Sequence, residues 1–318
     1  MALVGHEDAW QQWRDAQSGP RMHHAWLLAG KQGLGKAHFA VDAARELVAE
    51  PGSPPISAPH PDIITLTNLP KDDKEAKKRD EGTPFEAKRN ISVAQIREMQ
   101  KRLNTRPTLG DRRVIIIDPA DDLEKSASNA LLKSLEEPPA GTYFVLVAHR
   151  PARLLPTIRS RCRVLRFASL TDVQLGQIVS AKAPDVDAST RDAAIALAGG
   201  SPGAALEFVE HNLGALDRLL REISRSGDSS FTLRGQLSDT LGARPGRDRI
   251  LTTLNVARGV LAAELTGADK SRLPGIIEAH SQLVKLGAQA PTYNFDAGLL
   301  IMEIGSLLAK AANPSEAA

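Results

Sequence analysis

Hydrophobic residues in the first half of the chain gather in short runs separated by segments of helical spacing. The runs are rich in leucine, isoleucine and valine, which is typical of strands buried in a sheet. The intervening segments repeat their apolar positions every three or four residues, as amphipathic helices do. Five strands are predicted, at residues 25–29, 62–67, 114–117, 143–147 and 164–167. Their alternation with helices predicts an α/β domain whose parallel sheet has helices on both faces.

Beyond residue 168 no further strand-like run appears and the spacing is helical. Thr171 and Gln174 have the separation of a capping box ahead of an apolar helical segment, and Gly199-Gly200 ends the helix after it. The sequence therefore predicts three parts. An α/β domain at 1–168 precedes a compact three-helix unit at 169–212 and an all-helical domain at 213–318.

One stretch inside the first domain breaks the pattern. Residues 71–89 hold seven basic and six acidic side chains, and Phe85 is their one large apolar residue. Such a segment buries too little apolar surface to order itself. We therefore expect a mobile charged insert at about 70–90, on the surface of the α/β domain.

Composition excludes several classes of protein. The 318 residues are 42% hydrophobic and 25% charged, which is ordinary for globular domains, and the net charge of +2 requires no polyanionic partner. A single cysteine, Cys162, excludes a disulfide within the chain and a multi-cysteine metal site. No apolar run is long enough for a membrane span, and no signal peptide is recognisable. These features predict a cytoplasmic protein with no membrane partner.

The first helix of the α/β domain follows a glycine-rich loop. Residues 30–36, GKQGLGK, match the phosphate-binding pattern G-x-x-x-x-G-K, in which backbone N–H groups and a lysine face phosphate oxygens. The candidate nucleotide-binding residues are Gly30, Gly33, Gly35 and Lys36. The pattern continues with serine or threonine, whose hydroxyl binds Mg²⁺, but this chain has Ala37. The loop is therefore degenerate at its metal ligand, and Lys36 has two interpretations, a phosphate ligand or the partner of a nearby carboxylate.

A second departure follows the strand at 114–117. Asp118 stands where an acidic strand end belongs beside the loop, but Pro119 follows it and offers no base to activate water. Losing both the metal ligand and the base indicates a site that no longer hydrolyses nucleotide. The alternative interpretation is that Asp118 has a structural role, in which its carboxylate caps the next turn. Glu136 and Glu137, at a helix end before two prolines, are interpreted as structural.

Two further segments are more specific than the loop. The segments LLKSLEEPP (131–139) and Ser160-Arg161-Cys162, within 24–167, resemble bacterial DNA polymerase III clamp-loader subunits of the AAA+ family, and most of all the delta-prime subunits. The resemblance implies an AAA+ nucleotide-binding-like domain, a three-helix lid and a helical collar that holds a ring of five subunits. Gly200-Ser201-Pro202-Gly203 lacks the sensor arginine that active subunits carry there.

The resemblance also implies roles for particular residues. Arg161 would be an arginine finger that reaches the ATP of the adjacent subunit, in a non-hydrolysing delta-prime protein without ATPase activity of its own. The ordinary alternative for Arg161 is a surface ion pair. ATP or ADP would be held, if at all, without hydrolysis. The four-cysteine zinc module of many relatives is excluded because its ligands are missing.

The implied partners are the gamma/tau motor and delta subunits in a hetero-pentamer, with the sliding clamp and primer-template DNA reached through the complex. Arg97, Lys101 and Arg102 are candidates for phosphate contacts, although a solvated helix face explains them equally well. The competing hypothesis is an ATP-hydrolysing AAA+ subunit, either a gamma/tau-like motor or another remodelling ATPase. Ala37, Pro119 and Gly203 each argue against it.

Overall fold

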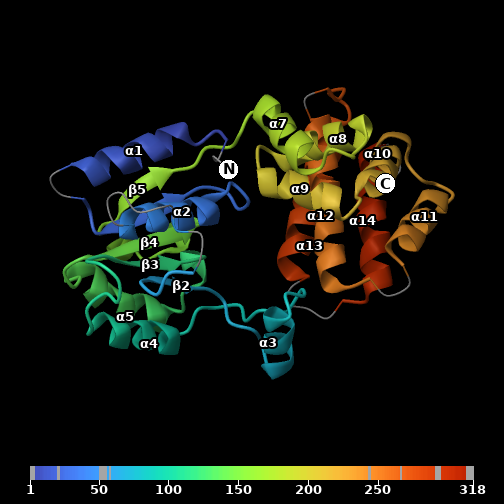
Figure 1. The fold of residues 1–318 in the computed structure, drawn as a ribbon. Helices are drawn as coiled ribbons and strands as arrows, with labels where there is room; N and C mark the ends of the chain where they lie inside the picture. The colour runs from blue at the N-terminus through green and yellow to red at the C-terminus, as the bar shows by residue number, and fades with distance from the viewer. Residues whose placement is uncertain are drawn as a thin grey trace. The chain divides into compact units, whose positions relative to one another are not determined.

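The structure is a computed structural model that describes residues 4–19, 22–49, 56, 59–242, 245–265, 267–290 and 295–312. The chain divides into two compact units, Met1–Leu170 and Thr171–Ala318 (Figure 1). The first contains the sheet and the second is helical. Each unit is described by itself.

The first unit is built on a sheet of five parallel strands. Their bounds are β1 (Ala25–Ala29), β2 (Ile63–Leu66), β3 (Arg113–Ile117), β4 (Thr142–Ala148) and β5 (Arg163–Arg166), in the order β2-β3-β4-β1-β5. The central strands β1 and β3 are buried along their whole length, because helices cover both faces. The predicted parallel α/β sheet is confirmed.

Helices lie on the two faces of this sheet. Helices α1 (Glu7–Ser18) and α2 (Lys36–Val48) cover one face, and α4 (Val93–Leu103) and α5 (Lys125–Glu136) cover the other (Figure 1). Each face has its own hydrophobic core, because alternate residues of a strand point to opposite sides. The short helices η1 (Ala120–Asp122), η2 (Pro151–Arg153) and α6 (Pro156–Arg159) connect the later elements.

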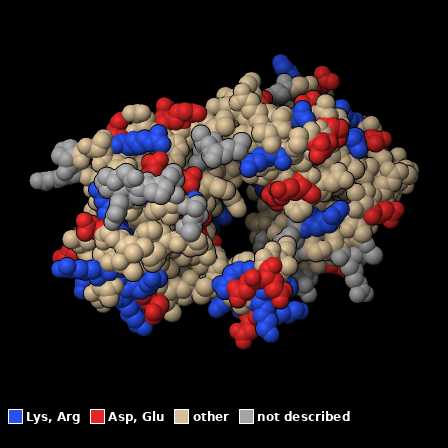
Figure 2. Space-filling view, viewed as in Figure 1, with Lys and Arg blue, Asp and Glu red and all other residues tan. Residues whose placement is uncertain are grey.

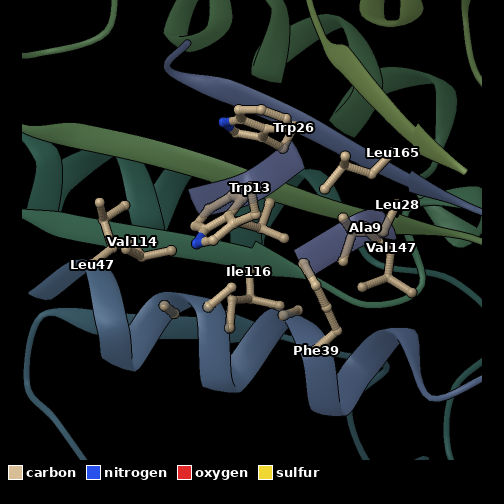
Figure 3. Close-up of a cluster of buried hydrophobic side chains, with 14 of the residues drawn as sticks. Ala9, Trp13, Trp26, Leu28, Phe39, Leu47, Val114, Ile116, Val147 and Leu165 are labelled. Atoms are coloured by element: carbon tan, nitrogen blue, oxygen red, sulfur yellow. The ribbon is translucent and has the colours of Figure 1, made fainter. Parts of the chain in front are cut away.

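Aromatic rings fill the core under α1 and α2. Trp13 and Trp26 are fully buried, with ring centroids 5.2 Å apart in an edge-to-face arrangement, and Phe39 of α2 lies against Trp13 (Figure 3). Large rings in this geometry contribute both area and a favourable quadrupole interaction. The tryptophans of the N-terminal segment therefore anchor α1 on the sheet.

A buried ion pair fixes the opposite side of the unit, where β2 and β3 begin. The Asp62 carboxylate is fully buried, accepts hydrogen bonds from the backbone N–H groups of Thr108 and Leu109 at 2.7 Å each, and lies 3.5 Å from Nη2 of Arg113. Arg113 in turn donates to the carbonyl oxygens of Arg102, Thr105 and Arg106. Together the two side chains hold the loop that follows α4.

The charged insert contains a helix, which corrects the expectation that this segment forms no ordered element; its mobility stays a prediction. Helix α3 (Asp73–Asp80) is capped by Asp72, whose side chain accepts from the N–H of Glu75. Glu75 is buried and accepts from Nζ of Lys78 at 2.8 Å and from the N–H of Glu86 at 2.6 Å. Local hydrogen bonds therefore replace the apolar burial that this segment lacks.

Charge over α3 is mixed. Lysine and arginine side chains interleave with aspartate and glutamate there (Figure 2). The segments on either side of α3 pair in an antiparallel bridge between Pro70 and Ala87, supported by an ion pair of 2.8 Å between Lys71 and Glu86. The insert is thus a helix held on a short hairpin.

Every regular element in the described part of the second unit is a helix. It contains α7 (Asp172–Lys182), α8 (Ala188–Ala198), α9 (Pro202–Glu210), α10 (Gly214–Ser226), α11 (Thr232–Leu241), α12 (Arg247–Glu264), α13 (Leu273–Gln289) and α14 (Ala297–Ala312). The capping box of Thr171 and Gln174 opens α7, and the all-helical C-terminal region is confirmed. The division at 212 into lid and collar stays a prediction. None of the described helices is long and apolar enough to cross a membrane.

Candidate functional site

The glycine loop joins β1 to α2, as the sequence predicts. Gly33 and Gly35 adopt left-handed backbone conformations, with φ of 78° and 80°, which side chains disfavour. At Gly30 an added Cβ would lie 2.5 Å from the carbonyl oxygen of Phe167. The three glycines are therefore required by the backbone path and by close packing, independently of any ligand.

Lys36 begins α2 and points back into the loop. Its side chain is buried, and its ammonium group donates to the carbonyl oxygens of Gly30, at 2.7 Å, and Lys31. Burial lowers the pKa of Lys36 to about 8, and the nearby charges of Asp118 and Asp121 oppose that shift. The lysine that would contact phosphate is thus bonded to its own loop.

Polar groups from two neighbouring strand ends lie near Lys36. Asp118 follows β3 and has its pKa raised by burial, while the charges of His149 and Lys36 oppose the shift. His149 follows β4, and burial lowers its pKa, as does the charge of Lys36. The structure therefore brings together the predicted residues Lys36 and Asp118 at the carboxyl edge of the sheet, where α/β folds bind ligands.

Asp121 also belongs to this edge, and sequence reasoning did not single it out. Its carboxylate accepts hydrogen bonds from the backbone N–H groups of His149 at 2.6 Å and Arg150 at 2.9 Å. It therefore fixes the turn after β4. The one sequence feature that could have indicated Asp121 is its position as an acidic residue three places after Asp118, in the short helix η1. Its partners are 28 and 29 residues away in sequence, so local spacing could not identify them.

The site does not fit a catalytic Mg²⁺ ion. Ala37 presents a methyl group where the loop pattern supplies a hydroxyl ligand, and Pro119 follows Asp118 without a side chain that could activate water. Across the described ranges, no group of three or more His, Cys, Asp or Glu side chains is arranged to hold a metal ion. The ammonium group of Lys36 would contact an anion at the loop by exchanging its carbonyl partners for that anion.

Arg161 lies outside the glycine loop, in the connection between α6 and β5. It follows α6 and precedes the edge strand β5, and its side chain is 34% exposed. Nη2 lies 2.5 Å from Oε1 of Glu136, at the end of α5, and Nη1 donates to the carbonyl oxygen of Thr157 at 2.8 Å. The guanidinium is therefore partly exposed and held by its own chain.

Comparison with known proteins decides the family. A family model described as DNA polymerase III, delta subunit, matches residues 5–171, the whole sheet included. The delta′ subunit of DNA polymerase III from Escherichia coli is 31% identical over 275 residues, which cover 81% of this chain and 76% of that protein. The chain belongs to the DNA polymerase III delta-prime family.

Two other relatives match parts of the chain. The delta′ subunit of Pseudomonas aeruginosa is 34% identical over 208 residues, 61% of this chain, and the match spans 58% of the length of that relative. The tau/gamma subunit of Haemophilus influenzae is 31% identical over 163 residues, covering 49% of this chain and 22% of that protein. The delta-prime family and the gamma/tau subunits are therefore related in sequence.

A solved structure supports the fold. A DNA polymerase III gamma subunit-related protein from Thermotoga maritima has a TM-score of 0.55 to this chain at 18% identity, and the match covers 96% of this chain and 99% of that one. The likeness shows that the two chains share a fold.

The candidate DNA-contacting residues of this delta-prime family member are exposed on α4. Lys101 forms an exposed ion pair of 2.8 Å with Glu98, and Arg102 lies 3.5 Å from the carbonyl oxygen of Pro61. Arg97 is exposed on the same helix. Their role in DNA binding stays a prediction.

Proposed function

We propose that the chain is a non-hydrolysing delta-prime subunit of a clamp loader, which supplies Arg161 to the ATP of a neighbouring gamma/tau subunit during loading of a sliding clamp on primed DNA. The observation that carries the proposal is a contrast within one chain. The nucleotide loop lacks the hydroxyl at Ala37, whereas the guanidinium of Arg161 is partly exposed on another surface of the same unit.

Loss of hydrolysis is supported by three positions. Ala37 cannot ligate Mg²⁺, and Pro119 cannot polarise water. Gly203, in the first turn of α9, has no side chain where related active subunits would carry an arginine. Nucleotide held by the loop would therefore remain unhydrolysed.

The proposed use of Arg161 follows from the chemistry of phosphoryl transfer. Charge develops on the phosphoryl oxygens in the transition state, and an arginine supplied by a neighbour raises the rate by about 10³–10⁵ in well-studied NTPases. Arg161 can serve a neighbour's site because its guanidinium is partly exposed.

The proposed partners are gamma/tau and delta subunits in a hetero-pentamer, held through the helical residues 213–318. The assembled complex, rather than the isolated chain, would bind the sliding clamp and primer-template DNA. The names of the relatives, delta′ and gamma/tau subunits of DNA polymerase III, support this assignment.

The test has two arms. The isolated chain should show no Mg²⁺-dependent ATP turnover above a protein-free control, whereas turnover at ordinary ATPase rates would favour the alternative, an ATP-hydrolysing gamma/tau-like subunit. In the reconstituted complex, Arg161→Ala should lower DNA-stimulated ATP turnover while the variant keeps the thermal unfolding midpoint of the wild type. An unchanged rate in the complex would contradict the proposed role of Arg161.

A further inference from the structure

The contacts of Arg161 leave part of its guanidinium available. The group carries five N–H donors. Nη1 donates a hydrogen bond to the carbonyl oxygen of Thr157, and Nη2 forms an ion pair with Glu136. At least three N–H donors therefore remain for another acceptor. Binding by its own chain and binding to a neighbour's phosphate are therefore compatible.

Glu136 supplies negative charge to a strongly basic segment. Residues 138–171 contain no aspartate or glutamate, and they contain six arginines, Arg150, Arg153, Arg159, Arg161, Arg163 and Arg166. In the described part of the chain, the carboxylate of Glu136 forms an ion pair with one of these arginines, Arg161.

The backbone that carries Glu136 is fixed. Leu135 beside it is buried, and the carbonyl oxygen of Leu135 lies 2.8 Å from Nε2 of His24, next to β1. Pro138 and Pro139 end α5 immediately afterwards, because proline cannot continue the helix. Glu136 is thus a carboxylate on a rigid element.

We propose that Glu136 is a positioning residue for Arg161. Its carboxylate holds the guanidinium in an orientation from which the remaining N–H groups can donate to the ATP of the neighbouring subunit. The inference rests on the proposed function of Arg161. A free arginine side chain loses much rotamer entropy when it is fixed, so an arginine already held by a carboxylate and a carbonyl loses less when it meets phosphate. A guanidinium with fixed orientation also presents its planar fork of donors to the phosphate oxygens in the productive orientation more often.

The experiment compares Glu136→Gln with Glu137→Gln in the full chain. The two positions are adjacent and the substitutions remove the same charge, but Glu137 is exposed and its side chain forms no ion pair with any residue in the described part of the chain. Each variant is assembled with its gamma/tau and delta partners on primed DNA, alongside Arg161→Ala. The activity that depends on Arg161 is the difference between the wild-type and Arg161→Ala complexes.

We expect Glu136→Gln to lower the kcat of that Arg161-dependent activity about two- to fivefold, the range expected from losing a partly exposed ion pair. The KM for ATP should stay unchanged, because the guanidinium acts on charge that develops in the transition state. Glu137→Gln should match the wild type. Equal kcat values for the two variants, or a change in KM alone, would overturn the positioning role while leaving the role of Arg161 intact.

A spectroscopic readout separates positioning from assembly. In the isolated chain, the Arg161 side-chain ¹⁵N–¹H signals, assigned by their loss in Arg161→Lys, should be resolved from those of solvated arginines in the wild type and in Glu137→Gln. They should merge with the solvated signals in Glu136→Gln. Resolved signals in Glu136→Gln would contradict the proposal. If Arg161→Ala leaves the complex unchanged, the proposed function fails, and the inference fails with it.

Discussion

The ammonium group of Lys36 lies 2.7 Å from the carbonyl oxygen of Gly30, so the lysine of the phosphate loop is bonded to the first residue of that same loop. A buried lysine of this kind destabilises the folded protein while it is charged, because burial lowers its pKa from the ordinary value of 10.5 to about 8. This relationship gives a dependence of stability on pH.

Between pH 8 and pH 10.5 the unfolded chain binds more protons at Lys36 than the folded chain does. The free energy of unfolding contributed by this residue therefore rises with pH, by at most about 1.4 kcal/mol per pH unit. Denaturant unfolding should therefore show that the free energy of unfolding of the wild type, relative to that of Lys36→Met, increases over this pH interval. The exposed Lys133→Met should show no such movement, and a parallel trend in both variants would contradict the buried position of Lys36.

Gly30 is expected to tolerate no side chain. Gly30→Ala places a Cβ 2.5 Å from the carbonyl oxygen of Phe167, and such overpacking costs about 1–3 kcal/mol. The control is Gly235→Ala in α11, where an added Cβ meets nothing within 4 Å. That substitution should stabilise its helix by about 0.5–1 kcal/mol. Denaturant unfolding measures both, and equal stabilities for wild type and Gly30→Ala would refute the close packing.

Asp62→Asn tests the buried ion pair. Burial alone would raise the pKa of Asp62, but the N–H groups of Leu109 and Thr108 and the charge of Arg113 hold it below the ordinary value of 3.8. The substitution leaves Arg113 without its carboxylate and should cost about 3 kcal/mol at pH 7. Because the lowered pKa stabilises the fold above pH 3.8, the cost should shrink as the pH falls through the folded-state pKa. Denaturant unfolding at a series of pH values measures this, and a cost independent of pH would be inconsistent with an ionised Asp62.

Glu75→Ala should open the insert while the rest of the first unit stays folded. The substitution removes the acceptor for Lys78 and for the N–H of Glu86, and leaving such donors unpaired should speed local amide exchange about tenfold. Hydrogen exchange of the Thr83, Glu86 and Lys88 amides is the measurement. Glu81→Gln, an exposed neighbour, should exchange like the wild type. Unchanged protection in Glu75→Ala would mean that other contacts order α3.

The strands of the sheet could be predicted because burial leaves a direct mark on composition. Val114, Ile115, Ile116 and Ile117 are all buried, and a run of this kind suits a central parallel strand. Strand order leaves no comparable mark, because it depends on which strands pair across long connections. The neighbours of β1, which are β4 and β5, follow it by more than a hundred residues.

Helix α3 was missed for a different reason. Its order depends on Asp72 and Glu75, whose hydrogen bonds join specific atoms and produce no periodic apolar pattern. The glycine loop could be predicted from its spacing, but the bonds of Lys36 to loop carbonyls could not. Asp121 and the contact of Glu136 with Arg161 depend on distant segments that folding brings together.

The aromatic core under α1 has a practical consequence for measuring this protein. All three tryptophans, Trp10, Trp13 and Trp26, lie in the first unit, and two of them are fully buried there. Intrinsic fluorescence excited at the indole band therefore reports on the sheet-containing unit alone. Far-ultraviolet circular dichroism also detects the helices of the second unit, so comparing the two signals during heating shows whether the units melt together or in sequence.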